Sequence, residues 1–341
     1  GSAIKACCTL TMAAPKTGLY LYPGREFAGR VIVIDIGMPK MAIKKAVTGT
    51  SLIDYEYVSE HVKPRKKDTH KGTYGHVLII GGSVGKSGAV HLASLGALRS
   101  GAGLVTMAVP ESINEIIEIK STEAMSVPLT LTSSKQLGSS ALKEIEKNLK
   151  GKDAVVIGPG IGNVDKGFIE GVLIACRRKR IPVVIDADAL NNLDGLAEVL
   201  NECRKGLKAI ITPHPGEAGR LLGVSSKVIQ EDRSESSLKL SKSGAVTVLK
   251  GASSIIADGN EIAINPSGGP ALASGGTGDV LSGMIASLIA QGKSCVDGAK
   301  LGVYLHGLSA DELSKREGEV GISATEIADN LPRTIKSLTV Q

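Results

Sequence analysis

From residue 76 onward, short runs of apolar residues alternate with longer stretches that have helical spacing. The apolar runs consist almost wholly of Val, Ile, Leu and Ala, which is typical of strands buried on both faces. Strands of this kind, joined through helices, form a parallel sheet that helices cover on both sides. We expect strands at residues 76–80, 104–109, 154–157, 182–185, 210–212 and 245–249, and helices ending at residue 99 and spanning 113–119, 137–149, 166–178, 217–222, 234–243, 279–291 and 296–313.

One further pair of strands is expected to run antiparallel. Residues 254–257 and 261–264 flank Asp258, Gly259 and Asn260, which are typical turn residues of a hairpin. The sequence therefore predicts an α/β fold over residues 76–341. Its mostly parallel central sheet would have helices on both faces and an antiparallel hairpin at its edge.

Residues 1–42 follow a different pattern. Two β-prone runs, at 9–12 and 31–36, flank the turn-rich sequence KTGLYLYPGREFAG, which predicts two or three strands without a helix. So few strands cannot bury both of their faces, and this part must pack on something else. Residues 43–75 are expected to be a connector with a short helix near 51–61.

The composition excludes several classes of protein. With 42% apolar residues, the 341-residue chain can build a large core. Aromatic residues make up only 2% and Trp is absent, which argues against a platform that stacks nucleic-acid bases, so we expect no nucleic-acid partner. The net charge of +6 is modest. The basic clusters at 63–67 and 177–180 are typical of solvated surface, although they would also suit an anionic small molecule.

Cysteines are few and scattered. Because the sequence contains no C-x-x-C, it predicts neither a zinc site nor a disulfide framework, and a reducing compartment is favoured. No apolar stretch is long enough to span a membrane, and the opening sequence GSAIKACCTLTMAAP is too weakly apolar for a signal peptide. We therefore expect a cytoplasmic protein without a membrane partner.

A glycine-rich stretch at residues 265–284, NPSGGPALASGGTGDVLSGM, contains one carboxylate, Asp279. Apolar residues with helical spacing follow it, so the loop GGTGD is expected to lead into a helix. Backbone N–H groups and the dipole at a helix start favour a bound phosphate. A carboxylate beside that anion could serve as the general base that deprotonates an attacking hydroxyl. The alternative is that Asp279 only caps the helix.

Other unusual residues also fall in loops expected at the carboxyl ends of strands, where ligands of parallel sheets bind. The first loop, GGSVGKSGA, has one residue too few between Gly81 and Gly85 for a Walker loop, and Val84 breaks the dinucleotide fingerprint. We expect it instead to admit an extended ligand beside Ala89. The loops are residues 81–87, 158–162, 186–191, 213–217, 250–254 and 274–279.

Side chains that suit a metal or a phosphate occupy three of these loops. Asp186 and Asp188 end a buried strand, where carboxylates suit magnesium or a ribose, although Asp188 could instead cap a helix. His214 lies between two prolines that restrict its ring. Glu217 opens the next helix, where a carboxylate also simply favours the dipole. Lys250 and the small residues after it could wrap a nucleoside diphosphate or form a surface turn.

Assembled, these loops resemble the NAD(P)H-hydrate dehydratase family of the ribokinase-like superfamily. Residues 1–42 resemble the closing strands of the NAD(P)H-hydrate epimerase domain, which bacteria commonly fuse ahead of the dehydratase. The part that would carry epimerase catalysis is missing from this sequence, so we expect no epimerase activity from it. The dehydratase resemblance covers roughly residues 50–335 and is carried, in family order, by HVLIIGGSVGKSGAVHLASLGALRSGAGLVTMAVPES, VVIGPGIG, VVIDADALN, TPHPGEAGRL, VLKGASSII and NPSGGPALASGGTGDVLSGMIASLIAQG.

The resemblance implies a ribokinase-like three-layer sandwich and a reaction of metabolite repair. The S-epimer of hydrated NADH or NADPH (NADHX or NADPHX) carries an extra hydroxyl on its reduced nicotinamide ring. A nucleotide phosphorylates that hydroxyl, and phosphate then leaves. ADP, giving AMP, is expected as the donor in preference to ATP, with Mg²⁺ screening the phosphates. Because family members are often tetramers or larger, a homo-oligomer is expected.

The same resemblance implies roles for individual residues. Asp279 would be the base, and the backbone N–H groups of the loop before it would form an anion hole at Gly276, Thr277 and Gly278. Mg²⁺ would be held, directly or through water, by Glu217 or Asp186. The hydrate would contact Ala89, Gly160, His214 and Asp279. The nucleotide would contact Lys250, Gly251, Ala252, Ser253, Ser254, Gly269, Gly275, Gly276, Thr277 and Gly278.

Two other functions remain open at this point. A vitamin kinase of the same superfamily, such as hydroxyethylthiazole kinase, would use the same anion hole but stop at the phosphorylated product. The loop at 81–89 and the pair His214 and Pro215 favour the dehydratase. A non-catalytic nucleotide-binding regulator would need an inert site, against which the intact sequence GGTGD argues.

Overall fold

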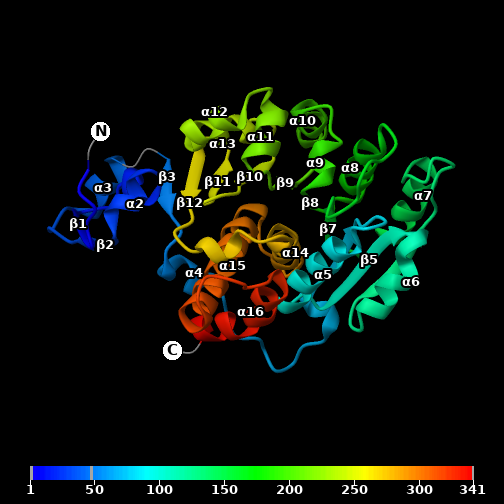
Figure 1. Ribbon diagram of the computed structural model, residues 1–341, viewed down its shortest axis with the longest axis horizontal. Helices are drawn as coiled ribbons and strands as arrows, with labels where there is room; N and C mark the ends of the chain where they lie inside the picture. The colour runs from blue at the N-terminus through cyan, green and yellow to red at the C-terminus, as the bar shows by residue number, and fades with distance from the viewer. Residues whose placement is uncertain (1–2, 47–48, 340–341) are drawn as a thin grey trace.

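The computed structural model describes residues 3–46 and 49–339, so both chain ends and part of the predicted connector lie outside it. Its centre is a ten-stranded sheet in the order β3-β12-β11-β10-β9-β8-β7-β4-β5-β6 (Figure 1). β11 runs antiparallel to β10 and β12, whereas the other described neighbours are parallel, which confirms the predicted α/β class. The strands are β3 (Thr50–Leu52), β4 (His76–Ile80), β5 (Leu104–Pro110), β6 (Met125–Leu129), β7 (Ala154–Ile157), β8 (Val183–Ile185), β9 (Ala209–Ile211), β10 (Val246–Leu249), β11 (Ile255–Asp258) and β12 (Glu261–Ile264).

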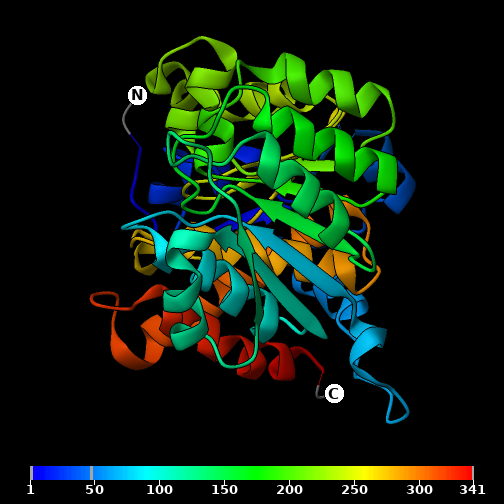
Figure 2. The ribbon, with the colours of Figure 1, turned by 90° about the vertical axis from the view of Figure 1, so that its right-hand side faces the viewer.

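The sheet is buried on both faces, as its apolar strands predict. In β4, Val77 and Ile79 pack into one core while Leu78 and Ile80 pack into the other, because side chains of a strand alternate between faces. Helices form a layer on each side (Figures 1 and 2). One layer holds α7 (Ser139–Asn148), α8 (Phe168–Lys179), α9 (Asp188–Asn191), α10 (Leu196–Arg204), α11 (Pro215–Leu222), α12 (Ser226–Glu231) and α13 (Arg233–Ser241). The other holds α4 (Tyr55–His61), α5 (Ser87–Arg99), α6 (Glu111–Lys120), α14 (Thr277–Ala290), α15 (Cys295–Glu317) and α16 (Ala324–Thr339).

Helices α5 and α14 touch backbone to backbone. A Cβ atom on Gly96 would lie 2.2 Å from the carbonyl oxygen of Val280, and one on Gly283 would lie 1.9 Å from that of Ala93. Only glycine permits such an approach without displacing a helix. The contact therefore fixes the C-terminal half of α5 against the N-terminal half of α14.

Residues 3–46 form a small unit beside the edge of the large sheet. β1 (Cys8–Met12) and β2 (Arg30–Ile34) pair in parallel, and α3 (Lys40–Ala46) follows them. The prediction of strands without a helix was wrong, since α1 (Thr17–Tyr20) and α2 (Gly24–Ala28) lie between them. Parallel strands need a crossover connection, and the turn-rich sequence supplies it as two short helices.

This N-terminal unit packs on the large sheet. The guanidinium of Arg25 donates to the hydroxyl of Ser253 at 2.5 Å and to the carbonyl of Pro266 at 2.8 Å. Leu21 packs against the buried apolar side chains of the β11–β12 hairpin. This part of the chain therefore packs on another part, through the segment between its two strands.

Six elements of the main sheet and its helix layers were not predicted, namely β3, β6, α9, α10, α12 and α16. β3 comes from the expected connector and pairs in parallel with β12. β6 contains Pro128, and α16 contains Pro332, residues that count against a strand and a helix in a sequence pattern. The short helix expected near residues 51–61 is α4. Among the described residues, no helix combines the length and apolarity that spanning a bilayer requires.

Candidate active site

The loops that follow the parallel strands meet at one edge of the sheet. The N–H of Gly82, after β4, donates to the carbonyl of Pro159, after β7, at 2.8 Å. The N–H of Lys250, after β10, donates to the carbonyl of Pro213, after β9, at 2.9 Å. These bonds join the loops in two neighbouring pairs.

Asp279 is the third residue of α14, which begins two residues earlier than the sequence predicts. Gly276 precedes the helix in the left-handed region, with φ of 91°. The hydroxyl of Thr277 donates back to the carbonyls of Leu272 and Ser274, at 2.9 and 3.1 Å, which ties the glycine loop to the helix start. The carboxylate of Asp279 accepts no hydrogen bond from a described residue, so the alternative that it only caps the helix is not supported.

The surroundings of Asp279 suit a base that works near neutral pH. Burial raises the pKa of its carboxyl to about 7, Asp186, Asp188 and Glu217 add to the rise, and the charge of Lys250 opposes it. A general base is most effective when its pKa lies near the working pH.

Lys250 lies between this base and a buried carboxylate. Its Nζ atom is 2.8 Å from Oδ1 of Asp186, whose side chain is only 1% exposed. A Cβ atom on Gly278 would lie 3.4 Å from the same Nζ, so the ammonium group borders the glycine loop. Although burial opposes the charged form, Asp186, Glu217 and Asp279 raise the pKa of Lys250. The lysine therefore keeps its positive charge beside the expected anion hole.

His214 and Glu217 cap the start of α11 together. The backbone N–H of His214 donates to Oε2 of Glu217 at 2.8 Å, and Nδ1 of His214 accepts from the N–H of Gly216 at 3.0 Å. Burial and then the charges of Lys250 and Arg220 lower the pKa of His214, so the ring is neutral at pH 7. Because Nδ1 accepts a hydrogen bond, the single ring proton resides on Nε2. The distance of 3.4 Å between Nε2 and Oε1 of Glu217 therefore joins a neutral ring to a carboxylate and is not an ion pair.

The loops expected to hold the hydrate are locked against each other. A Cβ atom on Gly160 would lie 2.9 Å from the Cβ of Ala89, and the hydroxyl of Ser83 donates to the carbonyl of Gly160 at 2.8 Å. Asp188 accepts from Nζ of Lys86 and from the N–H of Gly162, both at 3.0 Å. The carboxylate of Asp188 thus joins two loops rather than capping a helix. Lys86 was missed as a site residue, although its place in the glycine-rich loop was the available signal.

The segment expected to wrap the nucleotide is partly occupied by the N-terminal unit. Gly251 and Ala252 are exposed, but the side chain of Ser253 is buried. The hydroxyl of Ser253 donates to the carbonyl of Tyr20 at 2.6 Å and accepts from Arg25, which leaves only its backbone for a ligand. No pattern in the sequence pointed to this contact.

The other glycine segment has its own carboxylate. The N–H of Gly268 donates to Oδ2 of Asp311 at 2.9 Å, and Oδ1 of Asp311 would lie 3.8 Å from a Cβ atom on Gly269. Burial raises the pKa of Asp311, while its bond to Gly268 opposes the rise. Asp311 was also missed, because it lies on α15, far along the sequence from the loop that it supports.

The predicted metal ligands do not form a cage of protein atoms. Among residues 3–46 and 49–339, no three His, Cys, Asp or Glu side chains are arranged to hold a metal ion. Asp186 is engaged by Lys250, and Glu217 by the backbone of His214. The charges of Asp186, Asp188 and Glu217 nevertheless all act on Asp279. This oxygen-rich setting fits Mg²⁺ that arrives on nucleotide phosphates and keeps much of its water, the usual mode for this ion.

Two comparisons with known sequences indicate the same protein family. The sequence profile of the NAD(P)H-hydrate dehydratase family matches residues 77–333. The bifunctional NAD(P)H-hydrate repair enzyme Nnr of Moorella thermoacetica is 40% identical over 341 residues, which cover 99% of this chain and 64% of that enzyme. This chain therefore spans less than two thirds of the length of that relative.

Solved structures agree with the ribokinase-like fold that was predicted. The ADP/ATP-dependent NAD(P)H-hydrate dehydratase of Bacillus subtilis, co-crystallised with ATP/Mg²⁺, is similar with a TM-score of 0.74 and 29% identity, covering 86% of this chain and all of that one. The hydroxyethylthiazole kinase of Pyrococcus horikoshii, at 17% identity and a TM-score of 0.54, covers 82% of this chain and 93% of that one. It shares the fold alone.

Proposed function

This chain belongs to the NAD(P)H-hydrate dehydratase family, and we propose that it converts the S-epimers of NADHX and NADPHX back to NADH and NADPH by nucleotide-dependent dehydration. The observation that carries this proposal is the place of Asp279. Its free carboxylate stands in the first turn of α14, directly after a glycine loop and next to the cation of Lys250.

The proposed reaction has two stages. Asp279 takes the proton of the ring hydroxyl. As it does so, the hydroxyl oxygen forms a bond to the terminal phosphorus of the nucleotide, and the nucleotide leaves with one phosphate fewer. The carbon–oxygen bond then breaks with phosphate as the leaving group, and the neighbouring ring carbon loses a proton to restore the double bond. Phosphorylation thus turns a poor leaving group into a good one.

The residues around Asp279 have matching roles in the proposal. Backbone N–H groups of Gly275, Gly276, Thr277 and Gly278 would meet the charge that develops on the transferred phosphoryl group. Nζ of Lys250 borders this loop and would add a fixed positive charge. The remaining proposed nucleotide contacts are Gly251, Ala252, the backbone of Ser253, Ser254 and Gly269.

The proposed hydrate contacts are Ala89, Gly160, His214 and Asp279 itself. Ala89 and Gly160 would bound the ring, and the neutral His214 would present its Nε2–H as a donor. Mg²⁺ would bind the nucleotide phosphates, and Glu217 or Asp186 would reach it through water; the ion would screen the phosphate charges. We propose ADP, giving AMP, as the preferred donor, since residues 1–42 give this chain the layout of the fused bacterial enzymes.

A direct assay tests the reaction. Hydrated NADH, Mg²⁺ and either ADP or ATP are mixed with the chain, and recovery of the dihydropyridine absorbance and release of phosphate are followed together. We expect recovery with both nucleotides and a higher kcat/KM with ADP. Absence of recovery with either nucleotide would remove the proposal. Accumulation of a phosphorylated alcohol without phosphate release would instead identify a kinase, and tight nucleotide binding without either product would identify a regulator.

We further propose that residues 1–42 are the closing part of an epimerase-like domain and that 43–75 connect it to the dehydratase domain at 76–341. A homo-tetramer or larger assembly, in the cytoplasm, completes the proposal. Light scattering of the purified chain measures the assembly, and a monomer would contradict it.

A further inference from the structure

A cavity of about 750 Å³ lies at the end of α5 and α14 that is remote from Asp279. The C-terminal ends of α4, α5 and α14 reach it at His61, Arg99 and the cap residue Gln291. α16 and the segment that links α4 to β4 close its sides. None of the residues proposed above for the reaction lines this cavity.

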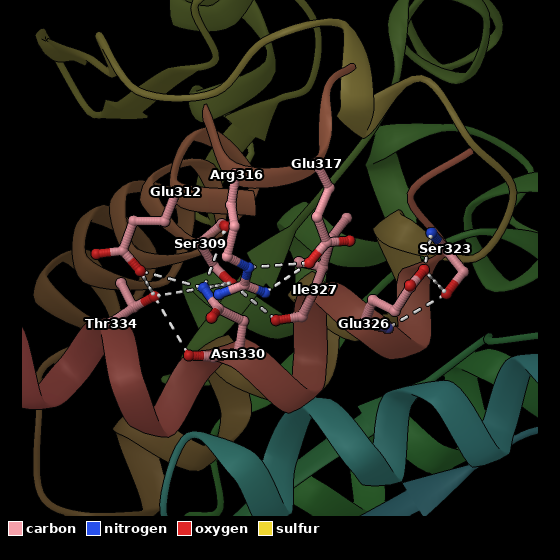
Figure 3. Close-up of polar contacts among 9 residues, drawn as sticks. All are labelled: Ser309, Glu312, Arg316, Glu317, Ser323, Glu326, Ile327, Asn330 and Thr334. Atoms are coloured by element: carbon pink, nitrogen blue, oxygen red, sulfur yellow. Dashed lines mark hydrogen bonds and ion pairs between the residues drawn. The ribbon is translucent and has the colours of Figure 1, made fainter. Parts of the chain in front are cut away.

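The floor of the cavity is apolar. It is built from Leu288 on α14, Leu301 and Leu305 on α15, and Ile335 on α16. The first three are at most 7% exposed, so the floor is part of the main core. α16 is held firmly on α15, because Glu312 accepts from the hydroxyl of Thr334 at 2.6 Å (Figure 3).

Several basic side chains around the cavity already interact with other groups of the chain. Arg99 pairs with Asp329 at 2.7 Å. Nζ of Lys293 donates to the carbonyl of His61, the last residue of α4, at 2.6 Å. Arg65 stacks on Tyr74 with 3.6 Å between its Cζ atom and the ring centroid, and donates to the carbonyl of Gly101. These contacts satisfy helix ends and loop carbonyls, as basic side chains commonly do.

Three other lysines on the rim have no such explanation. Lys63 and Lys66 come from the segment before β4, and Lys336 comes from α16. All three are exposed, and no carboxylate of a described residue lies within 4.0 Å of their Nζ atoms. Positive charge from two separate segments therefore faces one opening above an apolar floor.

We propose that this cavity binds a small amphipathic anion, a molecule with one carboxylate or phosphate group on an apolar chain. The volume falls within the range of roughly 300–1,000 Å³ that is usual for small-molecule sites. The lysines attract the charged head, and the leucine floor takes the chain. Because an ammonium group is a point charge without a fixed fork of donors, the rim does not select between carboxylate and phosphate.

Decanoate is a suitable probe, and isothermal titration calorimetry on the full chain measures its binding. We expect one site, with decanol and inorganic phosphate each binding much more weakly than decanoate. The triple variant Lys63→Gln/Lys66→Gln/Lys336→Gln should lose about tenfold in affinity, given the modest contribution of each exposed charge pair. The matched triple Lys147→Gln/Lys179→Gln/Lys227→Gln removes three exposed lysines elsewhere and should bind as the unchanged chain does.

A second variant tests the floor without changing charge. Ile335→Trp fills the cavity and should abolish decanoate binding while circular dichroism stays unchanged. Equal affinity of the lysine triple and the unchanged chain would overturn the proposal, as would equal affinity for decanol and decanoate. A separate apolar cavity of about 490 Å³ lies between the N-terminal unit and β3. If decanoate bound there instead, neither variant would change its affinity, and the proposal would be rejected. Co-sedimentation with phosphatidylglycerol vesicles, in place of decanoate binding, would identify a membrane contact and also reject the proposal.

Discussion

The Nζ atom of Lys250 lies 2.8 Å from Oδ1 of Asp186, and the same ammonium group acts on the carboxylates of Glu217 and Asp279. One partly buried cation therefore interacts with three acids, which lie in the loop after β8, on α11 and on α14. Removing it leaves these acids to repel one another, whereas removing one acid leaves the others compensated. The charge state of Asp279 is accordingly a property of the whole cluster.

The first prediction concerns the base. Asp279→Asn should lower kcat for dehydration by roughly 10²–10⁴-fold, the usual contribution of a positioned base. Calorimetry should show ADP binding nearly unchanged, because the loops hold the nucleotide. Asp297→Asn is the matched control, since Asp297 is likewise the third residue of its helix, after the cap Ser294. Normal turnover by the Asp279 variant would show that another group takes the proton.

The second prediction is a pH dependence with a defined sign. Because the base must be ionised and its pKa is raised to about 7, kcat/KM should fall as the pH drops through that value. Between pH 3.8 and about 7 the folded chain holds a proton that the unfolded chain has lost, so stability decreases as the pH rises across this window. Asp279→Asn should therefore melt above the unchanged chain at pH 8, by an amount that shrinks toward pH 4. A difference that grows toward acid pH would contradict the raised pKa.

The third prediction separates the role of Lys250 from simple loss of folding. Lys250→Met should cost about 3 kcal/mol of stability, because it leaves a buried carboxylate unpaired. It should also move the acid limb of the pH–rate profile to higher pH, since Lys250 lowers the pKa of Asp279. The double variant Lys250→Met/Asp186→Asn should regain much of the stability in urea unfolding. An acid limb that stays in place would mean that Lys250 does not influence the base.

The fourth prediction tests the contact between α5 and α14. Gly96→Ala places a methyl group 2.2 Å from the carbonyl oxygen of Val280 and should cost about 1–3 kcal/mol while lowering turnover. Gly88→Ala, in the same helix, meets no atom within 4 Å and should leave stability equal or raise it by up to about 1 kcal/mol. Urea midpoints of the two variants measure the difference. Equal midpoints would show that the helices can separate at little cost.

Much of the sheet could be predicted because its central strands are apolar runs with little ambiguity. The hairpin of β11 and β12 was also readable, since Asp258, Gly259 and Asn260 signal a turn. β3 could not be found this way, because Thr50, Ser51 and Leu52 do not form an apolar run and the strand owes its existence to pairing with β12. α16 was hidden by Pro332, whose cost is outweighed by the packing of its apolar face.

The site was predictable as a set of loops but not as a set of contacts. The sequence placed Asp279 and Lys250 in loops at the carboxyl ends of parallel strands, which is where ligands of such sheets bind. It could not show that Lys250 pairs with Asp186, 64 residues away, or that Lys86 pairs with Asp188, 102 residues away. The contact of Arg25 with Ser253 spans 228 residues. Such partners follow from the folded arrangement, and no local pattern encodes them.

The small strand β3 has a practical consequence for anyone who shortens this chain. It pairs with the outer side of β12 and so covers one border of the large sheet. A protein that begins at residue 53 would leave the N–H and C=O groups on that side of β12 unpaired, and bare borders of this kind recruit strands from other molecules. Such a truncated protein should precipitate as it concentrates, whereas one that begins ahead of Thr50 should remain dispersed.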